Sequence, residues 1–401
     1  MSEPFNRHPN HAANWPEPDP DARTQSGRLI ELIRSEVEAG GGKLPFDRYM
    51  ELALYAPWVG YYTGGARKFG ETGDFVTAPE ISPLFGRCLA RQCEQVLKGL
   101  GGGDLLEIGA GSGALAADLL AELDQLDALP ERYLILDVSP ELRQRQCETL
   151  EKRVPGLISR VEWIEDLPGD GFRGVVVANE LLDAMPVQRF RLEKGRVLEQ
   201  FVGFSDEQLM DSWGQPESPG LEAAVTSLWE KLGSWRDDYE SEINLRSLSW
   251  LKALEARFEA GLVLLVDYGY NRAEYYHPQR DRGTLMCHYR HRAHPDPFVY
   301  PGLQDITAYV DFSAVAGAAQ ETGFSVSGYT TQAFFLMSCG LDRLVAESDP
   351  NDVQAHMKLV QGVKHLTMPG EMGERFKVLG LTKGLDQPLL GFMMRDQRER
   401  L

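Results

Sequence analysis

The sequence lacks several features that would assign it to a specialised class of protein. Its 401 residues include only five cysteines, an odd number without the spacing of a disulfide framework, which predicts a reducing compartment. No apolar run approaches the length of a membrane span, so no membrane association is expected. Positive charge is scarce, because 41 lysines and arginines stand against 60 aspartates and glutamates, for a formal charge of −19. That charge disfavours nucleic acid as a partner, since its phosphates would be repelled.

The start of the chain also lacks the marks of a targeting segment. Residues 1–21 are rich in proline, asparagine, histidine and acids, and they have neither an apolar core nor an arginine-rich amphipathic pattern. We therefore expect a disordered tail over residues 1–25 and a cytoplasmic protein. The 43% apolar and 25% charged content is typical of a globular chain, and its length suits one large domain or two ordinary ones.

The most informative segment is a short apolar run that ends in three glycines. Residues 104–108 are predicted to form a buried parallel strand, and Gly109, Gly111 and Gly113 follow before a helix-forming run over 114–123. Alternating glycines let the backbone turn sharply and let a ligand lie against bare main chain. The N–H groups at the start of the following helix face whatever is bound. The segment therefore predicts a loop that binds a nucleotide-type cofactor.

Glu107, beside these glycines, favours S-adenosylmethionine over a dinucleotide. A dinucleotide loop must hold a pyrophosphate, which Glu107 would repel, and no lysine or arginine lies between Asp104 and Asp118 to offset the repulsion. S-adenosylmethionine carries a sulfonium and an ammonium group and no phosphate, so a carboxylate attracts it. Asp137 ends a second apolar run and is expected to bind both ribose hydroxyls, although NAD sites use such an acid too. A dinucleotide site and a glycine-rich turn without a ligand are the alternatives.

Apolar runs recur along the chain at the spacing of alternating strands and helices. We expect an α/β fold with a seven-stranded, mostly parallel, Rossmann-like sheet and a large insertion after the fourth strand. The strands are expected at 104–108, 133–138, 161–164, 174–178, 261–266, 324–329 and 376–381. The insertion is expected to hold a hairpin over 187–204 and then polar, helical material up to about residue 260.

The predicted organisation has six segments. They are a disordered tail (1–25), a helical and loop extension that includes a helix over 26–38 (26–100), the first part of the cofactor-binding sheet (101–186), an inserted hairpin and helical lobe (187–260), the remainder of the sheet with a lid loop (261–390) and a C-terminal tail (391–401). In an open parallel sheet, ligands bind beyond the carboxyl ends of the strands. Since Glu107, Asp137, Asn179, Glu180 and Asp267 all end predicted strands, we expect one site at this edge.

Four further motifs stand between residues 73 and 312. They read GDFVTAPEIS at 73–82, ANELLDAMP at 178–186, DYGY at 267–270 and GLQDITAYVDF at 302–312. Together with the glycine loop, they resemble the MidA family of class I S-adenosylmethionine-dependent methyltransferases, relatives of the mitochondrial complex I assembly protein arginine methyltransferase. The resemblance runs from about residue 49 to residue 383, and the motifs are specific in combination.

This resemblance implies an enzyme that methylates an arginine on a protein substrate and releases S-adenosylhomocysteine. The residues it implies as cofactor contacts are Glu107, Gly109, Gly111, Gly113, Asp137 and, in a segment that closes over the cofactor, Thr77 and Pro79. Tyr309 departs from the family pattern, in which a histidine is more frequent, so no role is assigned to it.

An arginine acceptor needs carboxylates, because its guanidinium group is cationic with a pKa of about 13.8. Methyl transfer from a sulfonium is an in-line displacement, so positioning supplies much of the rate. Glu180 is predicted to be the main guanidinium ligand and Asp183 its helper, since residues three apart in a helical turn face the same way. Asn179 is predicted to bind the cofactor amino group or the substrate. The alternatives are that the acids complement a helix dipole and that Asn179 caps the helix.

Two segments with aromatic and histidine side chains complete the candidate site. Trp163, at the third predicted strand, is expected near the adenine, with packing against the sheet as the alternative. Residues 287–294 contain a cysteine and three histidines, but Arg290 and Arg292 would oppose a cation. No metal is therefore expected, and a lid loop carrying Tyr289 and His291 is predicted instead.

Two other functions are open at this point. One is a methyltransferase that acts on a small molecule, and the other is an assembly or interaction factor that binds S-adenosylmethionine and uses the insertion as its partner surface. Both a monomer and a homodimer are compatible with the sequence.

Overall fold

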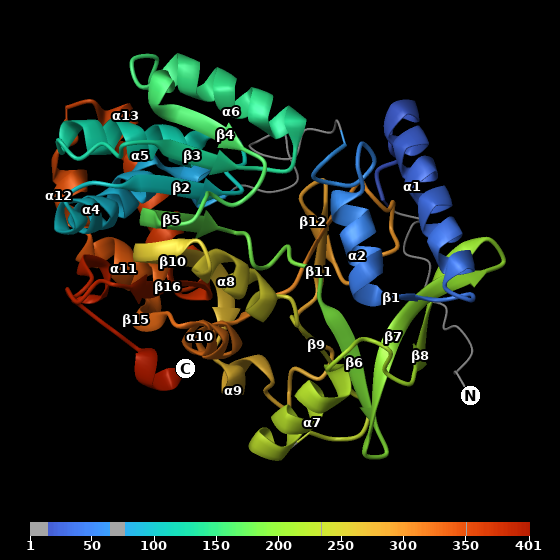
Figure 1. Cartoon of the computed structure of the whole chain (residues 1–401). Coiled ribbons are helices and arrows are strands. Elements are labelled where there is room, and N and C mark those ends of the chain that lie inside the picture. Colours follow the sequence, from blue (N-terminus) through green and yellow to red (C-terminus); the bar gives the residue numbers. More distant parts are fainter. Residues whose placement is uncertain (1–14, 65–76, 234, 350) are drawn as a thin grey trace. The chain divides into compact units, whose positions relative to one another are not determined.

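The computed structural model describes residues 15–64, 77–233, 235–349 and 351–401, which belong to two compact units (Figure 1). The large unit contains Val76–Leu182, Leu248–Arg272 and Val310–Leu401, and the small unit contains Met1–Phe75, Asp183–Ser247 and Ala273–Tyr309. Each unit therefore draws on three separate stretches of the chain, which differs from the six consecutive segments expected from the sequence.

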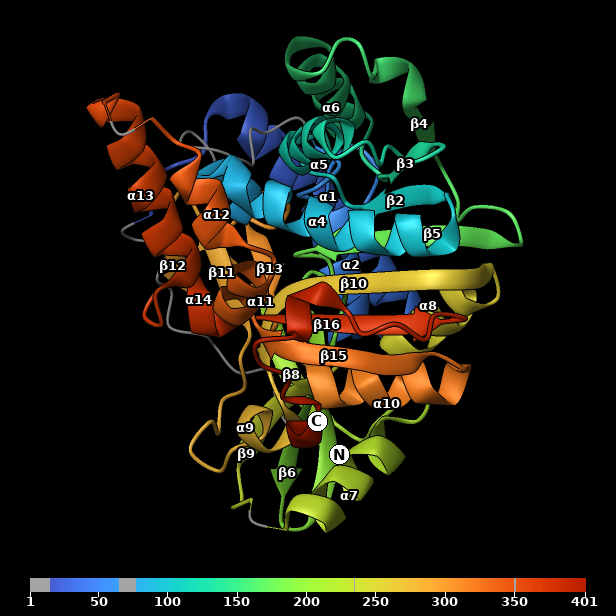
Figure 2. The same ribbon diagram turned by 90° about the vertical axis from the view of Figure 1, so that its left-hand side faces the viewer.

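A mixed sheet forms the centre of the large unit, in the order β15-β16-β10-β5-β2-β3-β4, with β14 pairing with β10 beside this path. The strands are β2 (Asp104–Ile108), β3 (Tyr133–Leu136), β4 (Val161–Ile164), β5 (Phe172–Asn179), β10 (Phe258–Tyr270), β14 (Val310–Asp311), β15 (Ser325–Thr331) and β16 (Phe376–Lys383). Neighbouring strands from β4 to β10 are parallel, whereas β16 is antiparallel to both of its neighbours. Figure 2 shows β5, β10, β16 and β15 following one another down the sheet. The predicted α/β class is confirmed.

Apolar side chains cover both faces of this sheet. Val175 and Val177 of β5 belong to the core cluster that includes α4 and α5, and Val176 between them is also buried. Strands that are buried on both faces read as continuous apolar runs, which is why the sequence identified them. The helices of the large unit are α3 (Ala78–Ile81), α4 (Pro83–Leu100), α5 (Ala114–Gln125), α6 (Pro140–Arg153), η2 (Ile158–Arg160), α8 (Ser247–Glu255), α10 (Phe312–Thr322), α11 (Gln332–Ser338), α12 (Leu341–Ala346), α13 (Val353–Thr367), α14 (Met372–Arg375), η3 (Leu390–Phe392) and η4 (Arg398–Arg400).

The end of the chain packs against this unit, although a tail was expected over 391–401. Phe392 is buried in the same apolar core, and Gln397 N donates to the carbonyl oxygen of Tyr329 at 2.6 Å. The sequence did not predict this packing, because the segment is short and polar and it is held by one aromatic side chain and a few main-chain hydrogen bonds.

The small unit is built around two antiparallel sheets. The first has the order β1-β7-β6-β9 with β8 on the outer edge of β7, and the second has the order β12-β11-β13. The elements are α1 (Pro20–Ala39), β1 (Leu44–Pro45), α2 (Phe46–Tyr55), β6 (Gln188–Glu193), β7 (Arg196–Ser205), β8 (Gln208–Gly214), α7 (Leu221–Leu232), β9 (Tyr239–Ile243), α9 (Arg272–Tyr275), β11 (Met286–Tyr289), β12 (Arg292–His294) and β13 (Asp305–Thr307). The predicted hairpin over 187–204 corresponds to β6 and β7.

The first helix begins earlier than the sequence pattern indicated. It was expected at residue 26 behind a disordered tail, but α1 starts at Pro20, with the side chain of Asp19 accepting a hydrogen bond from Ala22 N at 2.9 Å. A capping acid followed by proline at the first helical position is a start signal that outweighed the polar composition. The expected tail is therefore wrong for residues 20–25, and residues 1–14 lie outside the described part of the chain.

The insertion after β5 contains more strand than expected. The part that follows the hairpin, up to about residue 260, was expected to be helical, yet β8 and β9 lie there. Their low hydropathy concealed these strands, because they bury polar side chains, two of which pair with side chains of neighbouring strands. Gln200 donates to Asp211 at 2.9 Å, and Arg191 donates to Glu240 at 2.6 Å.

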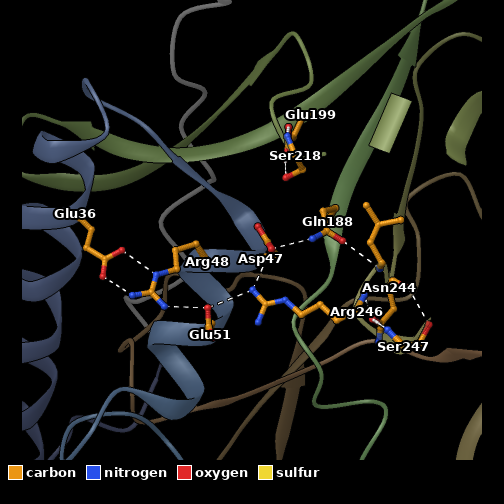
Figure 3. Close-up of polar contacts among 11 residues, drawn as sticks. Glu36, Asp47, Arg48, Glu51, Gln188, Glu199, Ser218, Asn244, Arg246 and Ser247 are labelled. Carbon is orange, nitrogen blue, oxygen red and sulfur yellow. Dashed lines mark hydrogen bonds and ion pairs between the residues drawn. The ribbon is translucent and has the colours of Figure 1, made fainter. Parts of the chain in front are cut away.

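A network of charged side chains joins helices α1 and α2 of the small unit to the loop that follows β9 (Figure 3). Arg48 of α2 donates to both carboxylate oxygens of Glu36 on α1, at 2.9 and 2.6 Å, and to Glu51 at 2.9 Å. Arg246 donates to Glu51 at 3.2 Å and to Asp47 at 3.1 Å. The acids of this network are thus paired with arginines, and the pairs tie separate stretches of the chain together.

Among the helices of the described residues, none combines the length and apolar character needed to cross a membrane.

Candidate functional site

The glycine loop follows β2 in the large unit, where the sequence placed it. Gly109, Gly111 and Gly113 have φ values of +74°, +53° and +81°, the left-handed region that favours glycine. A side chain at Gly113 would bring a Cβ atom within 2.9 Å of the Cα atom of Gln146. Gly113 also precedes the first residue of α5, so the free N–H groups of that helix open onto the loop.

Glu107, two residues before the loop, is buried and has an unusual electrostatic environment. Its carboxylate accepts a hydrogen bond from the hydroxyl of Tyr133 at 2.5 Å, from the neighbouring strand β3. Burial raises the pKa of Glu107 from 4.5 to about 7, the tyrosine bond acts to lower it, and Asp137 and Asp118 raise it further. A cationic ligand would reverse this shift, because it favours the charged carboxylate.

Asp137 follows β3, and hydrogen bonds from the backbone and from α6 hold its carboxylate. Its carboxylate accepts from Ser139 N at 2.9 Å and from the side-chain amide of Gln146 at 2.7 Å. Gln146 lies on α6 and also donates to the carbonyl oxygen of Gly111 at 3.1 Å, while its own oxygen accepts from the indole N–H of Trp163 at 2.9 Å. The structure thus brings together three predicted site residues through a fourth, Gln146, that the prediction missed.

The sequence did carry a signal for Gln146. It stands four residues from Leu142 and four from Leu150, and all three are buried. A polar amide in the apolar row of a helix needs a buried partner, and in this chain its partners lie at the candidate site.

The segment predicted to close over the cofactor forms the short helix α3, next to Thr77. It reaches the glycine loop through Glu80, whose carboxylate accepts a hydrogen bond from the hydroxyl of Ser112. Glu80 thus joins this segment to the glycine loop, and the contacts of Thr77 and Pro79 with the cofactor stay predictions. The motif residues 73–76 lie outside the described part of the chain.

The end of β5 differs from the prediction. Residues 180–187 connect β5 to β6, and the helical turn expected over Glu180 and Asp183 is absent from this described stretch. Glu180 has a φ of +51° and donates its N–H to the carbonyl oxygen of Val266 at 2.9 Å, which turns the chain out of helical geometry. The two acids consequently belong to different units. The helix-dipole and helix-capping alternatives are also wrong, because this segment has no helix to cap.

Two polar side chains surround the start of this connection in the large unit. Asn179 donates to a carboxylate oxygen of Glu180 at 3.1 Å, and the Oδ1 atom of Asn179 is buried with no hydrogen-bond partner among the described residues. Asp267 at β10 accepts from Leu182 N at 2.9 Å, so it fixes the backbone of the connection. Asp267 thus lies at the carboxyl edge of the sheet, as predicted, and its observed contact there is with the backbone of the connection.

Asp183 lies in the small unit near a second buried acid. Ala308 N donates to the carbonyl oxygen of Asp183 at 3.0 Å. Tyr62 donates to both carboxylate oxygens of Asp305, at 3.0 and 3.1 Å, and burial raises the pKa of Tyr62, with Asp305 and Asp183 adding to the effect. Asp305 lies in the motif at 302–312, but nothing in the sequence pattern distinguishes it from its neighbours. Tyr309, to which no role was assigned, donates its N–H to the hydroxyl of Thr284 at 2.9 Å.

Residues 287–294 form part of a sheet in the small unit rather than the predicted loop. Cys287 on β11 lies opposite His294 on β12, and Tyr289 is buried with its hydroxyl donating to the carbonyl oxygen of Pro16 at 3.1 Å. Within the described ranges, no group of three or more His, Cys, Asp and Glu side chains is arranged to hold a metal ion.

Known proteins resemble this chain over most of its length. The model of a family described as "Putative S-adenosyl-L-methionine-dependent methyltransferase" matches residues 88–330. The chain is 28% identical to the Drosophila melanogaster "Protein arginine methyltransferase NDUFAF7 homolog, mitochondrial", over 94% of this chain and 91% of that protein. It is 30% identical to the Homo sapiens "Protein arginine methyltransferase NDUFAF7, mitochondrial", over 85% of this chain and 80% of that protein.

A solved structure is similar over nearly the whole chain. It is a crystal structure from Burkholderia thailandensis of a "likely methyl transferase" bound to S-adenosyl-homocysteine, with 43% sequence identity and a TM-score of 0.92. The match covers 97% of this chain and 100% of that chain.

The curated relatives contradict the predicted cytoplasmic location, because the Drosophila melanogaster, Danio rerio and Homo sapiens proteins are all named mitochondrial. The prediction had rested on the composition of residues 1–21 and on the reduced cysteines. All five cysteines are free, but free thiols fit more than one reducing compartment and so did not discriminate.

Proposed function

Since the chain belongs to the family of S-adenosyl-L-methionine-dependent methyltransferases matched over residues 88–330, its methyl donor is S-adenosylmethionine, and we propose that its acceptor is an arginine of a protein. The observation that carries the proposal is that relatives at 28% and 30% identity, aligned over most of their length, are named protein arginine methyltransferases. The carboxylates that follow β5 supply the chemistry that a guanidinium group requires.

The residues at the carboxyl edge of the sheet fit this cofactor. The Oδ1 atom of Asn179 is a buried acceptor without a partner among the described residues, and the ammonium group of the cofactor would supply the missing donor. Hydrogen bonds from Ser139 N and Gln146 hold the carboxylate of Asp137 beside the glycine loop, and carboxylate oxygens are the acceptors that ribose hydroxyls require. When bound, S-adenosylmethionine supplies an electrophilic methyl group on a sulfonium.

We assign the remaining predicted contacts in the same way. Gly109, Gly111 and Gly113 offer bare backbone to the cofactor, Glu107 offers negative charge near its cationic groups, Trp163 lies against the adenine, and Thr77 and Pro79 belong to the segment that covers it. The indole N–H of Trp163 bonds to Gln146, which fixes the ring plane and supports a role beyond simple packing.

Glu180 is the proposed ligand of the acceptor guanidinium group. A non-glycine residue at positive φ costs about 1–3 kcal/mol, and such strained positions cluster at functional sites. Bonds to Val266 and Asn179 hold Glu180 in this conformation. A carboxylate in this position would fix the plane of the guanidinium group and draw its positive charge away from the attacking nitrogen.

The Glu180→Gln variant tests this role. It keeps the shape of the side chain and removes the charge, so methyl transfer should fall by at least about 100-fold while the Kd for S-adenosylhomocysteine stays near the wild-type value. Glu148→Gln, on the exposed side of α6, is the matched control. Transfer by Glu180→Gln at a near wild-type rate would show that another group binds the acceptor.

The acceptor itself can be identified by labelling. The protein is incubated with labelled S-adenosylmethionine and a lysate from cells that lack it, and the labelled species is analysed by mass spectrometry. Label on an arginine of a protein is expected. Label on lysine, or only on a small molecule, would contradict the proposed acceptor. Complete absence of label would favour an assembly or interaction factor that binds S-adenosylmethionine without methylating a substrate.

A further inference from the structure

We propose that Gln146 is a positioning residue for cofactor binding, which holds the ribose acid, the glycine loop and Trp163 in one arrangement. The inference rests on the S-adenosylmethionine cofactor and is independent of the identity of the methyl acceptor. It assigns a role to a buried amide that carries no charge and follows no motif.

Gln146 uses both ends of its amide group. The nitrogen donates to the carboxylate of Asp137 at 2.7 Å and to the carbonyl oxygen of Gly111 at 3.1 Å, while the oxygen accepts from Trp163 at 2.9 Å. The reverse orientation would place the amide oxygen against two acceptors and the amide nitrogen against a donor. The three partners therefore determine a single orientation of the side chain.

The backbone around Gln146 is fixed just as closely. Leu142 and Leu150, one turn to either side, are buried and set the rotation of α6. Arg143 on the same helix donates to the carbonyl oxygen of Asp137 at 2.8 Å and to that of Ile164 at 3.0 Å, which ties the ends of β3 and β4 to the helix. The loop approaches so closely that a Cβ atom at Gly113 would lie 2.9 Å from the Cα atom of Gln146.

This arrangement acts on the cofactor through Asp137. One carboxylate oxygen of Asp137 accepts from Ser139 N, and the other accepts from Gln146, so neither oxygen can rotate away without losing a bond. A pre-oriented carboxylate binds ribose hydroxyls without having to be ordered first. Without Gln146, the carboxylate of Asp137, the carbonyl group of Gly111 and the indole ring of Trp163 would each lose one of the hydrogen bonds that position them, and cofactor affinity would fall.

The first test is Gln146→Met, which keeps the length of the side chain and removes its hydrogen bonds. Leaving buried partners unsatisfied should raise the Kd for S-adenosylhomocysteine, measured by calorimetry on the full chain, by about 10- to 100-fold. Gln144→Met is the matched control, because Gln144 lies on the exposed side of the same helix, and its Kd should stay within about twofold of wild type.

A double-mutant cycle separates positioning from a merely structural role. If Gln146 acts through Asp137, then Gln146→Met should change the Kd by less than about threefold in an Asp137→Asn background. An additive effect in that background would overturn the proposal, as would a Kd for Gln146→Met within about twofold of wild type.

Trp163→Phe tests the same arrangement if the Gln146→Met variant does not fold. It removes one N–H donor to Gln146 and should raise the Kd by about 3- to 10-fold, again with little further effect beside Asp137→Asn. An unchanged Kd, or an effect that is additive with Asp137→Asn, would overturn the inferred arrangement.

Discussion

In the small unit, Glu36 and Glu51 both accept hydrogen bonds from Arg48 (Figure 3). In the large unit, by contrast, Glu107 accepts one from the neutral hydroxyl of Tyr133. Burial acts to raise the pKa of Glu51, but hydrogen bonds from Arg246 and Arg48 outweigh it and the pKa is lowered. Burial raises the pKa of Glu107 to about 7, because its hydrogen bond to an uncharged group offsets the effect only in part. The first arrangement keeps Glu51 charged and joins separate segments of the chain, and the second leaves a carboxyl group that a cationic ligand can ionise.

The difference shows how to separate structural from functional acids in this chain. Arginine partners lower the pKa of Glu51, so the ionised acid stabilises the fold and needs no ligand. A buried carboxyl group with a neutral partner destabilises the unliganded protein once it ionises, and cofactor binding would remove that penalty. Perturbed pKa values of this kind cluster at functional sites.

Replacing the functional acid should produce the largest effect. Glu107→Gln removes the negative charge and keeps an acceptor for Tyr133, so the Kd for S-adenosylhomocysteine at pH 8 should rise by about 10- to 100-fold. The unliganded variant should be more stable than wild type at this pH, by about 3 kcal/mol at most, since no charge is buried. Calorimetry and denaturant unfolding measure the two quantities. A variant with unchanged affinity and lower stability would place Glu107 with the structural acids.

The second prediction concerns the pH dependence of the wild-type protein. The folded pKa of Glu107 is raised above its ordinary value, so its contribution to stability is fully present below pH 4.5 and is lost as the pH rises through 7. The cofactor binds the ionised form, so affinity should change in the opposite direction. The Kd for S-adenosylhomocysteine should fall by about tenfold between pH 6 and pH 8.

The same titration with Glu107→Gln provides the control, because it leaves all other ionisable groups in place. Its Kd should vary by less than about threefold over this range. An equal pH dependence in both proteins would assign the proton to another group.

The smallest effect is expected from the paired acids of the small unit. Arg48 is 42% exposed at its side chain and bonds to Glu36 and Glu51, so Arg48→Gln should lower the free energy of unfolding by about 1 kcal/mol. The Kd for S-adenosylhomocysteine should not change. Denaturant unfolding at low and high salt checks the origin of the loss, since an ion-pair contribution shrinks as salt is added. A change in cofactor affinity without a change in stability would contradict the comparison.

The sequence predicted the parts of the site that depend on local backbone chemistry. Gly109, Gly111 and Gly113 adopt left-handed conformations, and Glu107 and Asp137 lie beside them at strand ends, because apolar parallel strands and glycine turns are local signals. The α/β class followed from the same runs. The start of α1 was placed too late, since the cap formed by Asp19 was overlooked.

The parts that were missed depend on contacts between distant stretches. The conformation of Glu180 comes from its bond to Val266, and the position of Asp183 from Ala308, neither of which is adjacent in sequence. Strands β8 and β9 bury polar residues whose partners lie on other strands, so their hydropathy is misleading. Gln146 shows an intermediate case, in which spacing marks the residue as buried and only the fold reveals its partners.

The position of β16 has a consequence for how the protein is made. This strand pairs with β10 on one side and β15 on the other, yet it follows both in the chain. During synthesis, β10 and β15 therefore each have an unpaired edge until residues 376–383 have left the ribosome. Such edges are templates for aggregation, so we expect nascent chains stalled before this point to need chaperone protection that the finished protein does not.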